Sequence, residues 1–395
     1  MQREEQVRVI KGLMTHLDNG TNVDAGVQVR NPVSAYTCPE RAAQEWQTFF
    51  TDYPQVLGLS VDLAEPGAFF TSEELGKPIL CTRDSDGVFR AFLNVCRHRG
   101  TIVENDKCGK KNVFSCPFHA WSYNTSGDLV AVPREDQFGT VDKSSHGLVA
   151  LPAVERHGLL WANANPQGAI NVDELLGDLG AELAGWDLTA ATPQWETTYD
   201  TPMNWKLAID TFGETYHFNT LHKDTLATTF YGNCQLYDTF ERNHRMSLCI
   251  RGIDHLRNLP EAQWHVLKAA LPVYYIFPNV QLIIGSGGPT LVRVYPLGTD
   301  PNNSYSQISF YTHGGMQASG WEDAATIQNN ALDRAKGFAE VIQAEDYWAA
   351  ATSHKGAMSG AQEYVLFGRN EPALHHYHNT YRQALGLDAL EVDTG

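Results

Sequence analysis

The distribution of apolar and polar residues along the chain changes near residue 170. Before it, short apolar runs alternate with turn residues, and Asp-Gly and Ser-Gly turns fall at 84–87 and 125–128. The runs, between residues 55 and 165, are GAFFT, PILCTRD, GVFRAFLNV, NVFSC, LVAVP and HGLLWANAN. Short runs separated by such turns predict an antiparallel all-β domain.

After residue 170, longer segments with helical spacing join the strands. Helices are expected over 171–186, from 204, over about 320–350 and over 370–386, and strands over 194–201, 273–285, 290–298 and 305–314. This mixture predicts an α+β domain in which helices cover a mainly antiparallel sheet. We therefore expect three parts: residues 1–50, which include most of a helix at 40–53 and pack on the body, a β domain at 51–170, and an α+β domain at 171–395.

Composition narrows the class of protein. Hydrophobic residues make up 43% and charged residues 19% of the 395, which is ordinary for a soluble globular enzyme. The formal net charge of −17 argues against a nucleic-acid groove and favours attraction of a basic electron donor. The charged N-terminus lacks the apolar core of a signal peptide, and no run is long enough to span a membrane. Seven cysteines, an odd number, suit a reducing compartment, so we expect a cytoplasmic protein that binds neither nucleic acid nor membrane.

Two short segments of the β domain each carry one Cys and one His. They are Cys96 with His98, and Cys116 with His119. A tetrahedral zinc site is one interpretation, but structural zinc ligands usually come as a cysteine pair and a histidine pair. One Cys and one His per segment suits a [2Fe-2S] cluster, with both thiolates on one iron and both imidazoles on the other.

A second group of candidate ligands lies in NWKLAIDTFGETYHFNTLH, residues 204–222. Read as a helix, this stretch places Asp210, Glu214 and His217 on a stripe beside an apolar face. That face consists of Trp205, Ile209, Phe212 and Tyr216. A solvated acidic edge would give the same pattern. His222 favours a metal site, because it can reach the same ion as His217 if the helix ends or bulges between them.

A third ligand is expected from the helix predicted over about 320–350. Asp346 continues the apolar stripe formed by Ala335, Phe338 and Ile342, and a carboxylate there is costly unless a cation or hydrogen bonds compensate it. Asp346 is therefore the predicted third ligand, and Glu345 is the second choice. Two histidines and a carboxylate on one face of an Fe(II) ion leave positions for O2 and substrate.

These motifs resemble those of Rieske non-haem iron oxygenase α subunits, the aromatic-ring-hydroxylating dioxygenase family. CRH at 96–98 and CPFH at 116–119 are similar to a Rieske domain, with Phe118 and Ala120 where Tyr and Gly are commoner. The resemblance to the catalytic domain is carried by Asn-Trp-Lys at 204–206, Glu214, His217, His222 and Asp346. Many members carry Asp at the position of Glu214.

The resemblance implies an all-β Rieske [2Fe-2S] domain and a helix-grip catalytic domain with a mononuclear Fe(II). It also implies a head-to-tail homotrimer in which His119 of one chain faces Glu214 of the next, and Glu214 hydrogen-bonds His217. Asp210 and Asn204 would support that arrangement. Electrons would come from a separate ferredoxin or flavin reductase. A β subunit accompanies some members, and the chain length favours the α-only form.

The sequence leaves the substrate and the reaction outcome open. We expect a terminal oxygenase that hydroxylates a small hydrophobic, aromatic substrate in a pocket lined by Phe212, Leu226, Phe230, Tyr275 and Phe277. A monooxygenase that removes an alkyl group from an amine or ether is the alternative within the family. The alternatives from other classes are a Rieske electron carrier with a binding domain and a zinc-stabilised binding protein.

Two other motifs are interpreted as structural. His375, His376 and His378 lie on a predicted amphipathic helix and are expected to face solvent, with no acid or thiol nearby. GSGGP at 285–289 lacks the strand and helix that flank a nucleotide fingerprint, so it is expected to be a loop.

Overall fold

The computed structural model describes residues 1–394, and the chain divides into two compact units. One unit contains residues 46–172. The other combines residues 1–45 with the chain from residue 173 onward. The N-terminal segment therefore groups with the C-terminal part of the chain. Within the described residues, no helix has both the length and the apolar character needed to cross a membrane.

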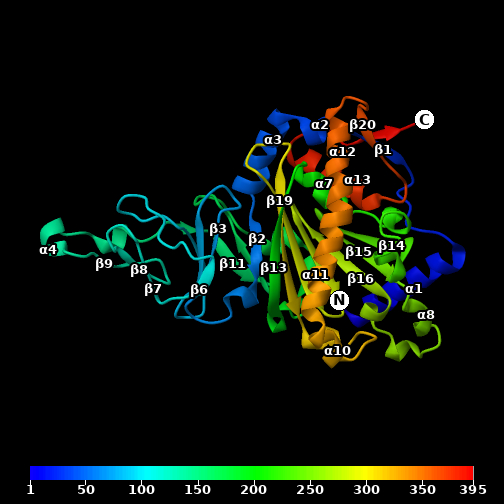
Figure 1. Cartoon of the computed structure of the whole chain (residues 1–395), viewed down its shortest axis with the longest axis horizontal. Helices are drawn as coiled ribbons and strands as arrows, with labels where there is room; N and C mark the ends of the chain where they lie inside the picture. Colours follow the sequence, from blue (N-terminus) through cyan, green and yellow to red (C-terminus); the bar gives the residue numbers. More distant parts are fainter. Residues whose placement is uncertain (395) are drawn as a thin grey trace. The chain divides into compact units, whose positions relative to one another are not determined.

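Residues 46–172 form antiparallel sheets, as the alternation of apolar runs and turns predicts (Figure 1). The largest has the order β10-β5-β4-β3-β6, and two others have the orders β11-β12-β2 and β7-β8-β9. The strands are β2 (Gln55–Leu59), β3 (Ala68–Ser72), β4 (Ile79–Arg83), β5 (Phe89–Leu93), β6 (Cys108–Lys110), β7 (Val113–Ser115), β8 (Ser122–Asn124), β9 (Leu129–Ala131), β10 (Ala150–Leu151), β11 (Ala153–Arg156) and β12 (Leu159–Ala162). Phe69, Phe92, Phe114 and Tyr123 join their side chains in one buried core.

The second unit is built on a seven-stranded antiparallel sheet with the order β13-β19-β18-β17-β16-β15-β14. Strands β14 to β19 follow one another along the chain, and β13 adds to the far edge beside β19. The strands are β13 (Thr192–Thr201), β14 (Phe230–Phe240), β15 (Asn243–Ile250), β16 (Ala270–Ile276), β17 (Val280–Gly285), β18 (Gly288–Pro296) and β19 (Ser304–Thr312). A small sheet of β20 (Tyr364–Phe367), β1 (Gln28–Pro32) and β21 (Glu391–Asp393) belongs to the same unit.

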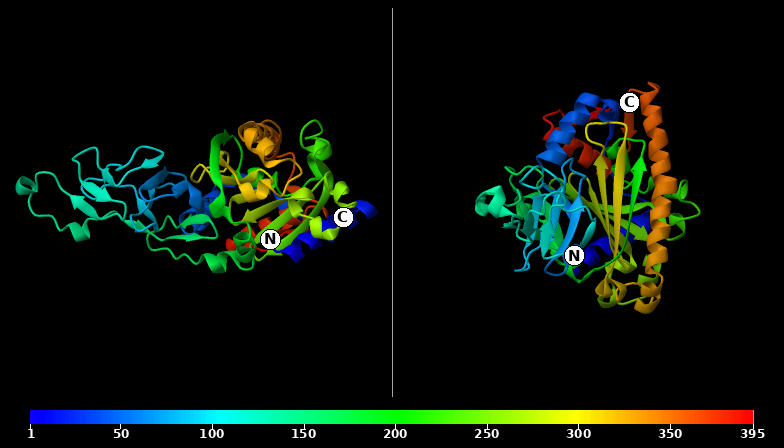
Figure 2. Two further views of the ribbon diagram at one scale, coloured as in Figure 1. Left: turned by 90° about the horizontal axis from the view of Figure 1, so that it is seen from below. Right: turned by 60° about the vertical axis from the view of Figure 1, so that its left-hand side comes forward.

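One long helical rod runs along this large sheet (Figures 1 and 2). It consists of α11 (Ala331–Val341), a π-helical turn (Ile342–Tyr347) and α12 (Trp348–Met358). The remaining helices that matter below are α1 (Arg3–Asn19), α2 (Ser34–Thr37), α6 (Leu179–Ala184), α7 (Trp205–Asp210), α8 (Ile253–Leu256) and α13 (Pro372–Ala384). A rod lying along an antiparallel sheet is the helix-grip arrangement expected from the sequence.

Several predicted elements differ from those observed. The segment 273–285, expected as one strand, forms the hairpin β16–β17, because the turn Phe277-Pro278-Asn279 interrupts it. The strands β14 and β15 were not predicted. The helix expected from residue 204 ends at Asp210, and the helix expected over 171–186 is two short helices, Val172–Leu176 and α6. GSGGP forms the turn between β17 and β18, as expected.

Candidate metal centres

The two Cys-His segments of the β unit adopt the same backbone form. The N–H of Gly100 donates to the carbonyl of Cys96 at 2.9 Å, and the N–H of Ala120 donates to the carbonyl of Cys116 at 2.9 Å. In both loops the cysteine N–H donates to the carbonyl five positions later, at 2.8 and 2.9 Å. Gly100 and Ala120 have positive φ angles of 80° and 56°, so each loop needs a left-handed residue four positions after its cysteine.

The thiols of these loops point inward and the imidazoles point outward. Cys96 and Cys116 are each 3% exposed, whereas His119 is exposed. The rings of His98 and His119 lie 4.7 Å apart, and Trp121 stacks on His98 at 4.9 Å. A cluster held here would have its thiolate-bound iron buried and its imidazole-bound iron near the surface of the unit.

The donors of these loops pair by type. The Cys116 thiol is within hydrogen-bonding distance of the Cys96 thiol, and the two imidazole rings lie 4.7 Å apart. This pairing fits a two-iron cluster, with both thiolates on one iron and both imidazoles on the other.

The second group of ligands depends on a helix that ends early. Because α7 stops at Asp210, the chain turns before His217, which lies in a 3₁₀ turn at Tyr216–Asn219. The N–H of Leu221 then donates to the carbonyl of His217 at 2.8 Å, which reverses the chain and brings His222 back. The break that the five-residue spacing of the histidines requires is thus present.

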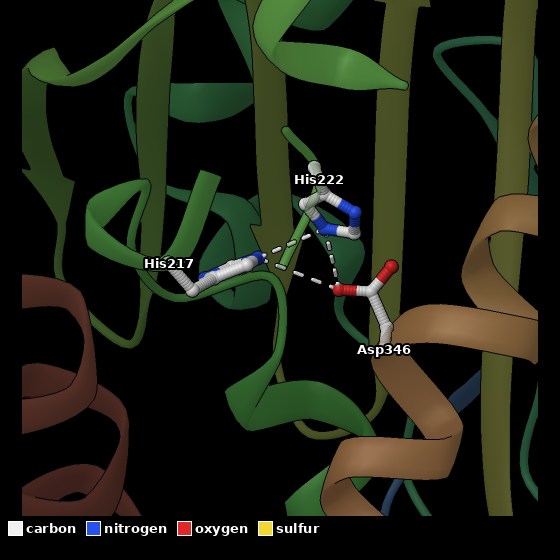
Figure 3. Close-up of side chains that lie close together, drawn as sticks. All are labelled: His217, His222 and Asp346. Atoms are coloured by element: carbon white, nitrogen blue, oxygen red, sulfur yellow. Dashed lines mark hydrogen bonds and ion pairs between the residues drawn. The ribbon is translucent and has the colours of Figure 1, made fainter. Parts of the chain in front are cut away.

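Three side chains converge on one point in this unit (Figure 3). His217 Nε2 and His222 Nε2 lie 3.1 Å apart, and Asp346 Oδ1 lies 3.1 Å from His222 Nε2 and 3.4 Å from His217 Nε2. Ligand atoms about 2.1 Å from an ion and at right angles around it would lie about 3.0 Å apart. Asp346 comes from the π-helical turn, and both histidines come from the loop after α7.

Each histidine is also held by a carboxylate at its other nitrogen. Glu214 contacts His217 Nδ1, and Glu345 accepts from His222 Nδ1 at 2.6 Å and from Thr225 Oγ1 at 2.9 Å. When both rings are neutral and carry their proton on Nδ1, their Nε2 lone pairs face each other. Two lone pairs 3.1 Å apart repel unless a cation lies between them, so this donor set fits a divalent metal ion. Glu345, the second choice for third ligand, instead orients His222.

The charges around the three donors favour a cation. Burial lowers the pKa of His217, but hydrogen bonds to Asp346 and Glu214 and the charges of both acids outweigh this effect and raise it to about 9. Burial raises the pKa of Asp346, yet its hydrogen bonds to His217 and His222 lower it overall. These carboxylates stabilise positive charge at the imidazoles. A metal ion can supply that charge in place of a proton.

An apolar cavity adjoins the three donors. A small cavity of about 50 Å³ touches His217, His222 and Asp346, and a larger one of about 280 Å³ shares part of its lining. The residues common to both are Leu226, Phe230, Leu271, Ile283 and Phe338. Among the expected pocket residues, Phe212, Leu226 and Phe230 line the small cavity.

Tyr275 and Phe277 lie elsewhere, contrary to the prediction. The Tyr275 hydroxyl donates to the Pro278 carbonyl at 2.8 Å and lies 2.9 Å from the Tyr381 hydroxyl, and Phe277 packs against Tyr381 of α13. The sequence analysis also missed Leu248, Leu271, Val273 and Ile283, which line the cavity from the central strands. Their alternation along β15 to β17 would have identified them, had β15 been recognised.

The two residues expected to support the site have different surroundings. Asn204 is the N-cap of α7: its Oδ1 accepts from the N–H of Lys206 at 3.1 Å and its Nδ2 donates to the Pro301 carbonyl at 3.0 Å. This bonding gives Asn204 a structural role. Asp210 accepts from His378 Nε2 at 2.9 Å and from the Tyr36 hydroxyl at 2.6 Å.

The histidines of α13 do not face solvent as predicted. His378 is 2% exposed and His375 is 9% exposed, and only His376 is less buried. An acid is also nearby, because His378 pairs with Asp210. The amphipathic pattern was misleading because Asp210 and Tyr36 come from remote parts of the sequence.

Comparisons with known proteins agree with this architecture. The profile of the ring-hydroxylating α subunit catalytic domain matches residues 188–387, and that of the Rieske [2Fe-2S] domain matches residues 54–151. The chain resembles choline monooxygenase of Spinacia oleracea, with 27% identity over 374 residues covering 90% of this chain and 78% of the relative. It is 31% identical to the carnitine monooxygenase oxygenase subunit of Escherichia coli K12, over 49% of this chain and 54% of the relative.

Solved structures show the same fold. A quaternary ammonium Rieske monooxygenase superposes with a TM-score of 0.76 at 20% identity, covering 91% of this chain and 96% of the other. Naphthalene 1,2-dioxygenase from Rhodococcus sp. gives a TM-score of 0.70 at 18% identity, covering 96% and 98%. Because the catalytic-domain profile matches half of the chain and a Rieske domain precedes it, the chain belongs to the family of Rieske non-haem iron oxygenase α subunits, the terminal oxygenases of their systems.

Proposed function

We propose that Cys96, His98, Cys116 and His119 hold the Rieske cluster and that His217, His222 and Asp346 hold the mononuclear iron. The observation that carries this proposal is the convergence of two Nε2 atoms and one carboxylate oxygen at the wall of an apolar cavity. When bound, the iron supplies O2 activation and the cluster supplies single electrons. Glu214 and Glu345 fix the two imidazoles, and the apolar lining excludes water from the reacting centre.

The substrate proposed is an uncharged, mainly apolar molecule, with a small aromatic ring as the best candidate. The small cavity is lined by phenylalanine and aliphatic side chains, and its acids, Glu214 and Asp346, are both engaged with His217. No further carboxylate lines either apolar cavity within the described residues. Benzene 1,2-dioxygenase of Pseudomonas putida is a relative of matching chemistry, 30% identical over 47% of this chain and 42% of its own.

A quaternary or tertiary amine is the second candidate, which would make the reaction an oxidation or dealkylation at a carbon next to nitrogen. Relatives named for choline and carnitine favour it. Phe212, Phe218 and Phe230 could also face a cation with their rings, since aromatic faces attract quaternary ammonium groups. Comparing the turnover of an uncharged aromatic substrate with that of a similar quaternary amine, such as toluene and benzyltrimethylammonium, separates the two substrate classes.

The partners proposed are a ferredoxin or flavin reductase and two further copies of this chain in a head-to-tail trimer. The acidic net charge suits attraction of a basic electron donor. A solved quaternary ammonium Rieske monooxygenase is described with inter-subunit electron transfer. In such a trimer, His119 of one chain would approach Glu214 of the next.

Counting metals tests the two-centre proposal. Iron, acid-labile sulfide and zinc are measured per chain in anaerobically purified protein, and the measurement is repeated on His217→Ala. We expect three irons and two sulfides in the wild type, and two of each in the variant. His255→Ala, a surface histidine of α8, is the control and should keep three irons. Zinc in place of iron, or an unchanged count in His217→Ala, would overturn the proposal.

A further inference from the structure

A second cavity also touches His217. Its volume is about 360 Å³, and its lining includes Tyr36, Asp210 and Glu371. Four residues line both this cavity and the small apolar cavity: Thr211, Glu214, His217 and Asp346. Because acids join its mainly apolar lining, the second cavity is called the acid-lined cavity below.

In the acid-lined cavity, acidic side chains outnumber basic ones. Its charged lining residues within the described chain are Asp210, Glu214, Asp346 and Glu371, and His217 is its one basic residue. Glu214 and Asp346 both contact His217. Asp210 is anchored by His378 and by the Tyr36 hydroxyl. Burial, and after it the charge of Asp210, holds the pKa of Tyr36 well above its usual value, so Tyr36 keeps the proton it donates to Asp210.

Glu371 has no such anchor. It precedes α13, and its carboxylate accepts one hydrogen bond, from the Gly368 N–H at 2.5 Å. Within the described residues, no lysine or arginine forms an ion pair with it. Burial raises the pKa of Glu371, and the charges of Glu214 and Asp210 raise it further, against the opposing effect of the Gly368 N–H. Glu371 thus retains a proton at a higher pH than an ordinary glutamate does.

The reaction of this family consumes protons at the mononuclear site. With two electrons from the reductase system, the balance is RH + O2 + 2e⁻ + 2H⁺ → ROH + H2O for monooxygenation, and R + O2 + 2e⁻ + 2H⁺ → R(OH)2 for dihydroxylation. The small apolar cavity offers no proton donor beyond the residues that it shares with the acid-lined cavity, apart from the ligand His222. The acid-lined cavity adds Glu371.

We propose that the acid-lined cavity is the route by which protons reach the mononuclear site, with Glu371 as the residue that holds and donates the proton. Glu371 loses its proton to water in the cavity and regains one from solvent. The charges of Glu214 and Asp210 favour the protonated form of Glu371. The inference rests on the proposed function and assigns a role to residues outside the metal-binding set.

Infrared spectroscopy of the metal-free protein tests the first half of the inference without relying on turnover. A protonated carboxyl band should titrate with a midpoint above the pKa of an ordinary glutamate, which is about 4.3. The band should disappear in Glu371→Gln and remain in Glu340→Gln, a surface acid of α11. A wild-type protein without this band, or a band that survives in Glu371→Gln, would refute Glu371 as the proton holder, whatever the enzyme oxidises.

Kinetics of the protein with both metal centres loaded test the second half of the inference, the proton route. Glu371→Gln should lower kcat about tenfold at unchanged substrate KM and iron content, and it should enlarge the solvent isotope effect on kcat. Added formic acid should restore part of the rate in Glu371→Gln and leave Glu340→Gln unchanged. Asp210→Asn should shift the infrared midpoint of Glu371 downward. An unaltered kcat and isotope effect in Glu371→Gln would contradict the route.

Discussion

At the scale of single residues, the geometry of the mononuclear site depends on which nitrogen of each histidine is free to bind a metal ion. Glu214 and Glu345 bind the Nδ1 atoms, so both Nε2 atoms face Asp346 and each other. The two carboxylates lie outside the ligand set, yet they determine the direction of the lone pairs that a metal ion uses. Their removal should therefore change metal affinity more than it changes the fold.

Replacing Glu345 by Gln measures this effect. The amide can still contact His222 and Thr225 but carries no charge, so Fe(II) affinity should fall about 10- to 100-fold. Anaerobic Fe(II) titration of the metal-free protein provides the measurement, with Glu340→Gln as a control expected to match the wild type. Asp346→Asn should lose more affinity than Glu345→Gln. The reverse order would mean that Glu345, and not Asp346, is the third ligand.

The two cluster loops carry different residues at the position that needs a positive φ angle, glycine in one and alanine in the other. Ala120 has a φ of 56°, a conformation that costs a residue with a Cβ about 1–2 kcal/mol. Ala120→Gly removes this cost but adds unfolded-state entropy worth about 0.4–1 kcal/mol, so a net gain of up to about 1.6 kcal/mol is expected. Gly100→Ala should lose a similar amount. Thermal unfolding of the two variants provides the check, and a loss of stability in Ala120→Gly would refute this account of the loop.

The candidate ligands could be selected from the sequence because few residue types bind iron and their spacing is characteristic. Their supporting partners could not. Asp210, on the predicted metal-side stripe, pairs with His378 from 168 positions later along the chain and with Tyr36 from 174 positions earlier. No local pattern reports such contacts, so His378 was predicted to be solvent-facing although it is buried.

At the scale of elements, the strands that were missed contain buried polar residues. β15 is buried along nearly its whole length, yet it reads NHRMSLCI. Arg245 of β15 is fully buried and pairs with Glu5, Glu182 and Asp238, the first two of which lie on α1 and α6. An arginine and a histidine inside a strand break the apolar alternation by which strands are recognised. The mostly apolar strands β18 and β19 were located correctly, whereas β16 and β17 were predicted as one continuous strand.

The π-helical turn at Ile342–Tyr347 could not be foreseen either. A regular helical phase places Asp346 on the apolar stripe and Glu345 about 100° away from it. The wider π-turn instead directs both acids to the same site, Asp346 to the Nε2 atoms and Glu345 to His222 Nδ1. Helical phase selected Asp346, which does converge with His217 and His222, on an incomplete description of the helix.

The end of α7 is held against α13 through a glycine. A Cβ at Gly213 would lie 2.2 Å from Leu374 Cδ2, closer than atoms can approach. Gly213→Ala should therefore cost about 1–3 kcal/mol and weaken Fe(II) binding, because Glu214 follows directly. Gly337→Ala is the matched control: Gly337 is exposed on α11 with open space around it, so this change should stabilise the protein by up to about 1 kcal/mol.

Urea unfolding and Fe(II) titration compare these two variants. If the clash with Leu374 is the cause, Gly213→Ala combined with Leu374→Ala should lose less stability than the sum of the single losses. Strict additivity would show that the glycine is required for another reason.

At the scale of the whole molecule, the two proposed sets of ligands belong to different units. Cys96, His98, Cys116 and His119 all lie within residues 46–172, and His217, His222 and Asp346 all lie in the other unit. A variant that loses one centre should therefore keep the other one intact. This separation makes it possible to ask which chain's cluster serves which chain's iron.

Mixed trimers answer that question. One variant, Cys96→Ala, lacks the cluster and keeps the iron site, and the other, Asp346→Asn, keeps the cluster and lacks the iron site. Each should be inactive alone, because electrons and O2 activation are needed at the same iron. If electrons pass between neighbours in a head-to-tail ring, random co-assembly at equal amounts places a working cluster before a working iron at about one interface in four (one half times one half). Co-expressed protein should then show about a quarter of wild-type turnover. Transfer within one chain would leave the mixture inactive, since no single chain carries both centres.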